Sequence, residues 1–383
     1  MTASQWLEVL ISFSVQVAVL ITACTTLERA VVRAADRCAV WNTFFLSVLL
    51  LGVGAVLLPR LHLLHPWSGL DSQTVLAVNA AQSAIGTVVL SIWCVGAALS
   101  LVRWIARGYL LRRDLQRCER LSDERAVALL NLANLEFPGP APPVVLISDD
   151  ADGPFCWQLH SPTLVLPRFL LDGDADDLRH VLLHELEHLK TNHPVQLFLQ
   201  HLAQVVFWFH PSVWRAGSIA SLVRELTCDE VAARVGAGSA AYLRTLLHIA
   251  ERCEQRRNAS AIGFSRTPSE IVLRARRLVE LAKNPQGTAS RWGLGRWTAC
   301  AAVLAAMALS SLVWIPSDPL ASPRSLWSPW PKWTAQALHC FGYNLRDYEE
   351  FDRRTQVYEL SLDCGDPSVP AAAPSADGLS PNS

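Results

Sequence analysis

Charged side chains are scarce in this chain of 383 residues. Asp, Glu, Lys and Arg together make up 17% of it, whereas hydrophobic residues make up 51%. An average soluble domain carries about 25% charged residues, so this composition excludes an ordinary soluble protein. The first apolar run also lacks a basic segment before it and a small-residue cleavage pattern after it, which argues against a cleaved signal peptide. The chain is therefore expected to stay in a membrane.

Four long uncharged runs take the place of the missing charge. They cover residues 9–27, 40–58, 75–102 and 297–315, and each is bounded by charge or Pro on at least one side. A helix needs about 20 mostly apolar residues to cross a bilayer, and each run suffices. One such run could be a buried core helix, but four in one chain favour spans. The sequence predicts a mainly α-helical membrane protein with about four transmembrane helices.

The distribution of Arg predicts how these spans are oriented. Arg residues crowd the loop after the first run and the segment after the third, whereas the loop at 59–74 holds Arg60 alone. Short cytoplasmic loops carry the excess of Lys and Arg in membrane proteins. Residues 106–293 are therefore predicted to be cytoplasmic, with the N-terminus and the C-terminal tail on the other side.

A fifth apolar run, at 194–214, is a poor lipid-exposed span because polar side chains interrupt it: Gln196, Gln200, His201, Gln204 and His210. A single crossing there would also separate the two halves of the site described next. We expect a buried or membrane-dipping helix that turns near His210 and Pro211.

Residues 184–188 read His-Glu-Leu-Glu-His inside an apolar stretch. Two His four residues apart fall on one face of a helix, so the imidazoles of His184 and His188 can reach one metal ion. Glu185 projects from the adjacent edge, where its carboxylate can take a proton from a water that attacks a peptide carbonyl. This H-E-x-x-H pattern predicts a catalytic Zn²⁺ site with Glu185 as general base. The alternative is an exposed helix with scattered charge, which the apolar flanks disfavour.

A zinc site of this kind needs a third protein ligand, and Glu225 is the best candidate. Glu225 and Asp229 share one face of a predicted helix, so Glu225 can bind the metal while Asp229 accepts the other ring N–H of a liganding His. A solvated acidic helix face is the alternative reading of this pair. Other side chains compete for the third position: His180, His193, His201 and His210, and, more weakly, Cys228.

A short strand bracketed by prolines is predicted just before the zinc helix, formed by Thr163, Leu164, Val165 and Leu166. Prolines at both ends suit the edge of a sheet. Such an edge could bind an extended substrate by strand addition and place a peptide bond over the metal. An ordinary strand inside a sheet is the equally open alternative.

These motifs, in this order, resemble the BlaR/MecR family of bacterial membrane zinc peptidases, peptidase family M56. The resemblance covers nearly everything up to about residue 315 and rests on Pro154-Phe155, the strand with its prolines, the H-E-x-x-H helix, and the stretches 207–214, 225–230 and 263–264. It implies a zincin-like α+β domain of the gluzincin type, with zinc on His184, His188 and Glu225, Glu185 as base and Asp229 in support. The chain departs from the family pattern at three positions that are not ligands: His193, His210 and Gln158 stand where Asp, Asn and Gly are usual.

The best-known members of that family carry a large penicillin-binding sensor, and here the resemblance stops. Residues after 315 are too few for such a domain and contain no Ser-x-x-Lys motif. They are predicted to form a small extracytoplasmic module at 317–365, in which Cys340 and Cys364 flank a strand at 356–362 and form a disulfide. Residues 366–383 are rich in Pro, Ala and Ser and are predicted to be disordered.

The predicted organisation places three spans in residues 1–105, a cytoplasmic zinc peptidase domain in 106–293 and a fourth span in 294–316. The predicted function is a zinc metalloendopeptidase of the bacterial inner membrane that hydrolyses a cytoplasmic protein, such as a transcriptional repressor, in response to an external signal. A housekeeping membrane protease resembling the M48 group and a non-catalytic receptor that holds zinc are the alternatives. The expected partners are the lipid bilayer, the substrate protein and a second copy in a homodimer, without direct contact to nucleic acid.

Overall fold

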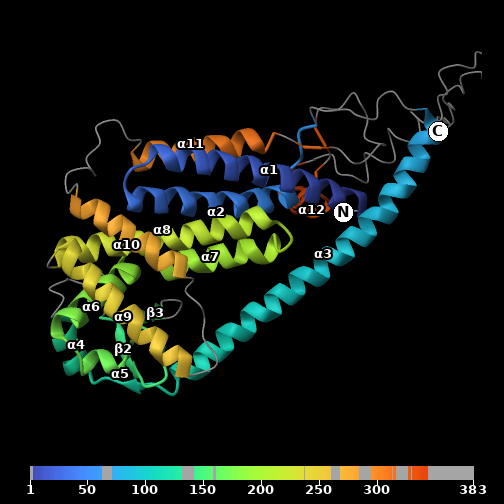
Figure 1. Ribbon diagram of the computed structural model, residues 1–383. Coiled ribbons are helices and arrows are strands. Elements are labelled where there is room, and N and C mark those ends of the chain that lie inside the picture. Colours follow the sequence, from blue (N-terminus) through green and yellow to red (C-terminus); the bar gives the residue numbers. More distant parts are fainter. Residues whose placement is uncertain are drawn as a thin grey trace, which may run out of the picture.

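The computed structural model describes residues 3–62, 71–131, 142–157, 161–236, 238–259, 268–283, 295–312, 314–315, 327–328 and 330–343. Helices dominate this part of the chain. Figure 1 shows a layer of long helices and, below one end of it, a smaller unit of helices and short strands. The predicted mainly α-helical class with a small α+β part is confirmed at this level.

Among the described residues, three helices are long and apolar enough to cross a membrane: α1 (Ala3–Ala30), α2 (Ala34–Leu57) and α3 (Ser72–Leu115). They coincide with the first three predicted runs. The fourth run forms α11 (Arg296–Ser310), whose 15 residues fall short of the about 20 that a span requires. The fourth span therefore stays a prediction.

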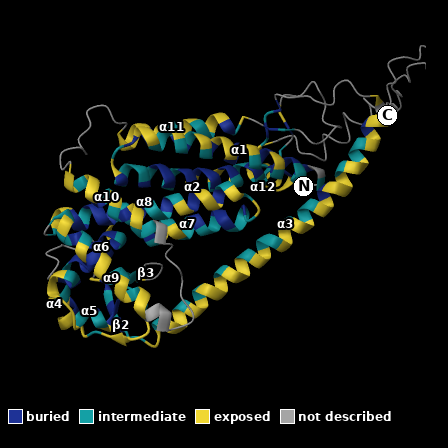
Figure 2. Cartoon of the chain, in the orientation of Figure 1, coloured by how far each residue is buried: buried dark blue, intermediate teal, exposed yellow. Residues whose placement is uncertain are grey.

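The longest element is α3, with 44 residues. At 1.5 Å per residue it measures about 66 Å, roughly twice the hydrocarbon core of a bilayer. It therefore continues without a break past the predicted domain border at 105 and into the Arg-rich segment. Its apolar side chains are mostly exposed, as Figure 2 shows, which suits a helix that faces lipid.

The fifth apolar run forms a hairpin of α7 (His193–Val206) and α8 (Pro211–Val235). The chain reverses before His210, and Pro211 opens α8, where its missing N–H removes no helical hydrogen bond. This confirms the predicted turn. Figure 1 shows the two helices side by side, and α2 packs against both of them. The hairpin therefore returns the chain to the end of the layer where the predicted ligands lie.

Two Trp residues fasten α3 to the tip of this hairpin. Trp93 Nε1 donates to the carbonyl of Val206 over 3.0 Å, and Trp208 Nε1 donates to the carbonyl of Trp93 over 3.2 Å. Gly96 makes room for the Trp208 ring, because a Cβ at this position would lie 2.1 Å from it. A larger residue at 96 would push the hairpin away from α3.

The smaller unit contains a four-stranded sheet in the order β1-β2-β4-β3. The inner strands β2 (Val144–Ser148) and β4 (Thr163–Pro167) run parallel. The outer strands β1 (Glu119–Arg120) and β3 (Phe155–Trp157) pair antiparallel with them. Apolar side chains of β2 and β4 share one core with the surrounding helices: α4 (Asp123–Asn131), α5 (Arg168–Leu171), α6 (Ala175–Lys190), α9 (Ser239–Ala259) and α10 (Pro268–Lys283).

The prediction that the strand at 163–166 forms a sheet edge is wrong. β4 pairs with β2 on one side and β3 on the other, and its substrate-binding candidates are all buried: Thr163, Leu164, Val165 and Leu166. The prolines do not mark an edge strand here. They lie at the ends of the strand, where their missing N–H removes no hydrogen bond between neighbouring strands. Among the described strands, β3 is the outer strand that packs beside α6.

The last described segment, with α12 (Lys332–His339), returns to the far end of the helical layer (Figure 1). The Arg60 N–H donates to Ser328 Oγ and the Ser328 N–H donates to the Arg60 carbonyl, each over 2.8 Å. Glu8 of α1 pairs with the Arg60 guanidinium over 3.2 Å in a buried site. Cys340 is exposed, whereas Cys364 and the predicted strand at 356–362 lie outside the described residues.

Candidate metal centre

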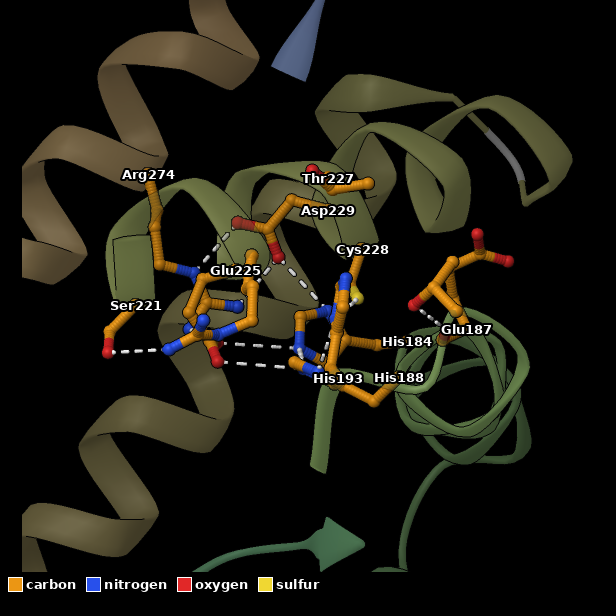
Figure 3. Close-up of polar contacts among 12 residues, drawn as sticks. His184, Glu187, His188, His193, Ser221, Glu225, Thr227, Cys228, Asp229 and Arg274 are labelled. Atoms are coloured by element: carbon orange, nitrogen blue, oxygen red, sulfur yellow. Dashed lines mark hydrogen bonds and ion pairs between the residues drawn. The ribbon is translucent and has the colours of Figure 1, made fainter. Parts of the chain in front are cut away.

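Helix α6 presents the two His of the predicted motif. Asp174 caps its first turn by accepting a backbone N–H, and the fully buried Leu182 and Leu183 fix its rotation against the core. His184 and His188 lie one turn apart on the same side, and their Nε2 atoms are 3.2 Å from each other. Figure 3 shows the two imidazoles beside the acidic side chains of α8. The two imidazole nitrogens are therefore close enough to bind the same metal ion.

Glu225 of α8 lies opposite the two imidazoles. Its Oε2 is 3.5 Å from Nε2 of His184, and its Oε1 is 3.5 Å from Nε2 of His188. Tetrahedral zinc with bonds of about 2.0–2.2 Å places neighbouring donor atoms roughly 3.3–3.6 Å apart. The two imidazole nitrogens lie 3.2 Å apart, and each lies 3.5 Å from a different oxygen of Glu225, so the carboxylate faces both rings. These residues could therefore hold Zn²⁺ after a small adjustment that brings one Glu225 oxygen to the metal.

Three more side chains stand behind His184. Nδ1 of His184 lies 3.1 Å from Oδ1 of Asp229 and 2.9 Å from the hydroxyl of Tyr242, which itself donates to that Oδ1 over 2.7 Å. Arg274 of α10 donates two hydrogen bonds to Asp229, and its Nη1 lies 2.9 Å from Oε2 of Glu225. Because Asp229 accepts the Nδ1 proton, His184 offers Nε2 to a metal.

Nearby charges set the protonation of His184 and Asp229 in the metal-free protein. Burial alone would lower the pKa of His184, but hydrogen bonds and negative charge from Asp229 and Glu225 raise it to about 9. Burial alone would raise the pKa of Asp229, but Arg274 and His184 lower it to about 2. Asp229 is therefore ionised at neutral pH, and a metal ion must displace a proton from His184.

Glu185 is buried on the side of α6 near the sheet edge. Burial raises the pKa of the Cys156 thiol on β3, and the charge of Glu185 adds to that rise. The Glu185 carboxylate is therefore within electrostatic reach of the outer strand β3. A buried carboxylate next to the paired His can exchange a proton with a reacting group there.

A second set of donors competes with the one that contains Glu225. Among the described residues, donor atoms of His184, His188 and Cys228 lie within 4.8 Å of one another. In the metal-free protein, burial and the surrounding carboxylates raise the pKa of the Cys228 thiol well above its usual value. A bound metal ion deprotonates a thiol that coordinates it, so this pKa does not exclude Cys228. Glu225 differs from Cys228 in facing both imidazoles, with one carboxylate oxygen 3.5 Å from each ring nitrogen.

The other His candidates do not face the metal position. His193 Nδ1 lies 2.9 Å from Nδ1 of His188, so His193 stands behind that ring. The remaining three contact other groups: His180 at Thr245, His201 at Trp104 and His210 at the Ser14 carbonyl.

Neither Tyr242 nor Arg274 is among the residues predicted from the sequence, because neither belongs to a motif. Both come from helices after α8, and Arg274 is 45 residues away from the Asp229 that it binds. The available signal for Arg274 is its place four residues before the buried Leu278, which puts both on the inner face of α10. A charged residue on a buried face needs a partner of opposite charge.

Comparison with known proteins gives two matches. The sequence model of the family described as BlaR1 peptidase M56 matches residues 8–278, a range that contains every residue of the site. The chain is also similar to the Regulatory protein BlaR1 of Bacillus licheniformis, with 22% identity over 151 residues. That match covers 39% of this chain and 25% of the relative, so it spans about a quarter of the relative's length.

Proposed function

The chain belongs to the BlaR1 peptidase M56 family, and we propose that it is a zinc metalloendopeptidase of the bacterial cell membrane that acts in signalling. Family membership and the three long apolar helices make it a membrane metallopeptidase. The observation that carries the zinc proposal is that Nε2 of His184 and Nε2 of His188 lie 3.2 Å apart and that each lies 3.5 Å from an oxygen of Glu225.

The residues divide the chemistry between them. Zinc, when bound, supplies a Lewis acid that polarises a peptide carbonyl and makes water acidic enough to attack near neutral pH. Glu185 accepts a proton from the attacking water and delivers it to the nitrogen of the departing amine as the peptide bond breaks. Asp229 fixes the tautomer of His184, and Arg274 holds both carboxylates in place.

The substrate is proposed to be a cytoplasmic protein that presents an extended segment beside β3. The support is that the site helices lie at the Arg-rich end of α1 and α2. Arg277 of α10 contacts the Val32 carbonyl in the loop between these spans, and Arg296 of α11 contacts Asp36 over 3.3 Å. The positive-inside rule assigns that end to the cytoplasm.

The signalling role is proposed from two observations. The similar protein of Bacillus licheniformis is named a regulatory protein. In this chain, the last described segment packs against Arg60 at the opposite end of the spans, where an external event can act on it. A transcriptional repressor is the substrate class that fits a membrane protease with this role.

The two alternatives have less support. A non-catalytic receptor would need zinc for structure only, and structural sites have four protein ligands and no base. This site has a buried Glu185 beside the paired His, and a structural site has no need of such a base. A housekeeping protease would not need the C-terminal segment that packs on the outer end of the helices.

Labelling of new protein N-termini in living cells tests this proposal for any cytoplasmic substrate. Cells with the wild-type chain should show cytoplasmic N-termini that are missing in cells with Glu185→Gln. Glu187→Gln is the matched control, because Glu187 is a buried residue on the opposite face of the same helix. If wild type and Glu185→Gln give the same cytoplasmic N-termini, the chain is not a cytoplasmic protease.

A further inference from the structure

His193 stands directly behind the zinc candidate ligand His188. The Nδ1 atoms of the two rings lie 2.9 Å apart, while Nε2 of His188 points to His184 and Glu225. Asn192 makes this approach possible, because its left-handed φ of 56° folds the start of α7 back onto the last turn of α6. Asn tolerates this conformation better than most residues do.

The hydrogen atoms in this contact can be assigned from the chemistry. A His that binds a metal through Nε2 carries its proton on Nδ1, so His188 donates and His193 Nδ1 accepts. The single proton of His193 is then on Nε2, which faces Cys38 Sγ at 3.8 Å.

Cys38 belongs to α2, one turn after the first residue of this helix and just before the predicted span at 40–58. Its thiol donates to Oε1 of Gln196 over 3.5 Å, and Nε2 of Gln196 donates to the Thr191 carbonyl over 2.9 Å. Two neighbours also contact this series: Cys228 Sγ lies 3.6 Å from Nδ1 of His193, and Nδ2 of Asn42 donates to Cys38 Sγ over 3.8 Å. The series leads from His188 through His193 to α2 and returns to the end of α6.

We propose that His193 is a positioning residue for His188 and that it couples this zinc ligand to the membrane helix α2 through Cys38. The inference rests on the proposed zinc site and names how that site is regulated. A shift or rotation of α2 displaces the Cys38 sulfur, His193 follows, and the ring of His188 turns away from the angle that zinc requires. A movement of α2 in the membrane would therefore change the metal site directly.

The positioning role is tested by zinc affinity, measured by competition with a chelator on the purified full chain. His193→Leu removes the acceptor and should weaken zinc binding about ten- to a hundredfold, as loss of a ligand-orienting partner does. His193→Asn keeps an acceptor near the place of Nδ1 and should recover most of that loss. The thermal midpoints of the metal-free variants serve as the folding control, and they should agree with each other.

The coupling to α2 is tested by a double-mutant cycle. Cys38→Ala should weaken zinc binding in the wild-type chain but have no further effect in His193→Asn, whose side chain cannot reach Cys38. Cys24→Ala, which removes another buried sulfur from the spans, should leave zinc affinity unchanged. Equal effects of Cys38→Ala in both backgrounds would overturn the link to α2.

Two further results would overturn the positioning role. Wild-type zinc affinity in a folded His193→Leu shows that His188 needs no partner. Equal weakening in the Leu and Asn variants, together with one fewer nitrogen neighbour in zinc-edge X-ray absorption, shows that His193 is itself a ligand. A wild-type chain that binds no zinc would instead contradict the proposed function, so the two failures are distinguishable.

Discussion

Arg274 donates two hydrogen bonds to Asp229, from Nε to Oδ2 over 2.7 Å and from Nη2 to Oδ1 over 2.6 Å. Both side chains are buried, with 3% and 1% exposure. A guanidinium fits a carboxylate in this two-bond geometry, and Lys cannot reproduce it. Since Nη1 of Arg274 also lies 2.9 Å from Glu225, one side chain of α10 orients a proposed ligand and its supporting carboxylate together.

Arg274→Gln should therefore destabilise the fold and weaken zinc binding. Removal of one partner from a buried ion pair costs about 3–5 kcal/mol of unfolding free energy. Arg274→Lys should lie between wild type and the Gln variant in both measurements. Arg276→Gln on the exposed face of α10 is the matched control, and its thermal midpoint and zinc affinity should equal those of wild type. An Arg274→Gln chain with both properties unchanged would show that α10 does not support the site.

The choice between Glu225 and Cys228 predicts the atoms around the metal. Zinc-edge X-ray absorption of the wild-type chain should show nitrogen and oxygen neighbours at about 2.0–2.2 Å and no sulfur at about 2.3 Å. Cys228→Ala should keep the bound zinc, whereas Glu225→Ala should lose most of it. A sulfur neighbour that disappears in Cys228→Ala would replace Glu225 as the third ligand.

Zinc affinity should rise with pH between neutrality and about pH 9. The pKa of His184 in the metal-free protein is raised to about 9, so below that pH the ring holds a proton that zinc must displace. Each pH unit toward 9 should therefore strengthen the apparent affinity by up to about tenfold, and this contribution ends above the pKa. Asp229→Asn removes a charge that raises this pKa, so its increase should end at lower pH. An affinity that is constant from pH 7 to pH 9 would contradict the protonation assigned to His184.

The predicted disulfide of Cys340 and Cys364 tests the topology. If residues after 315 are extracytoplasmic, the two thiols should be oxidised and close a loop of about 24 residues, which stabilises the module by roughly 3 kcal/mol. Mass spectrometry after thiol blocking, with a membrane-impermeant reagent on intact cells, measures both properties. Free thiols that react only after lysis would place the tail in the cytoplasm.

The features that the sequence could predict depend on spacing along single helices. The pairs His184 and His188, and Glu225 and Asp229, each lie four residues apart, and a period of 3.6 residues puts each pair on one face. The turn at Pro211 could also be predicted from the sequence, because a proline fits best at the first position of a helix.

The features that escaped prediction depend on how separate elements meet. The position of β4 inside the sheet follows from its pairing with β3, which the prolines at its ends do not reveal. Arg274 reaches Asp229 from another helix, and His193 reaches α2 across 155 residues of sequence. The apolar run at 297–315 continues past Ser310, the last residue of α11, so the run alone does not give the length of this helix.

The most direct test of the central claim compares zinc content and peptide-bond cleavage in the same preparations of wild type, Glu185→Gln and Glu187→Gln. Glu185 is proposed as the base and not as a ligand, so its Gln variant should keep about one zinc per chain and lose cleavage. Glu187→Gln should keep both. Cleavage by Glu185→Gln at the wild-type rate, or a wild-type chain without zinc, would contradict the account of this site as a catalytic zinc centre.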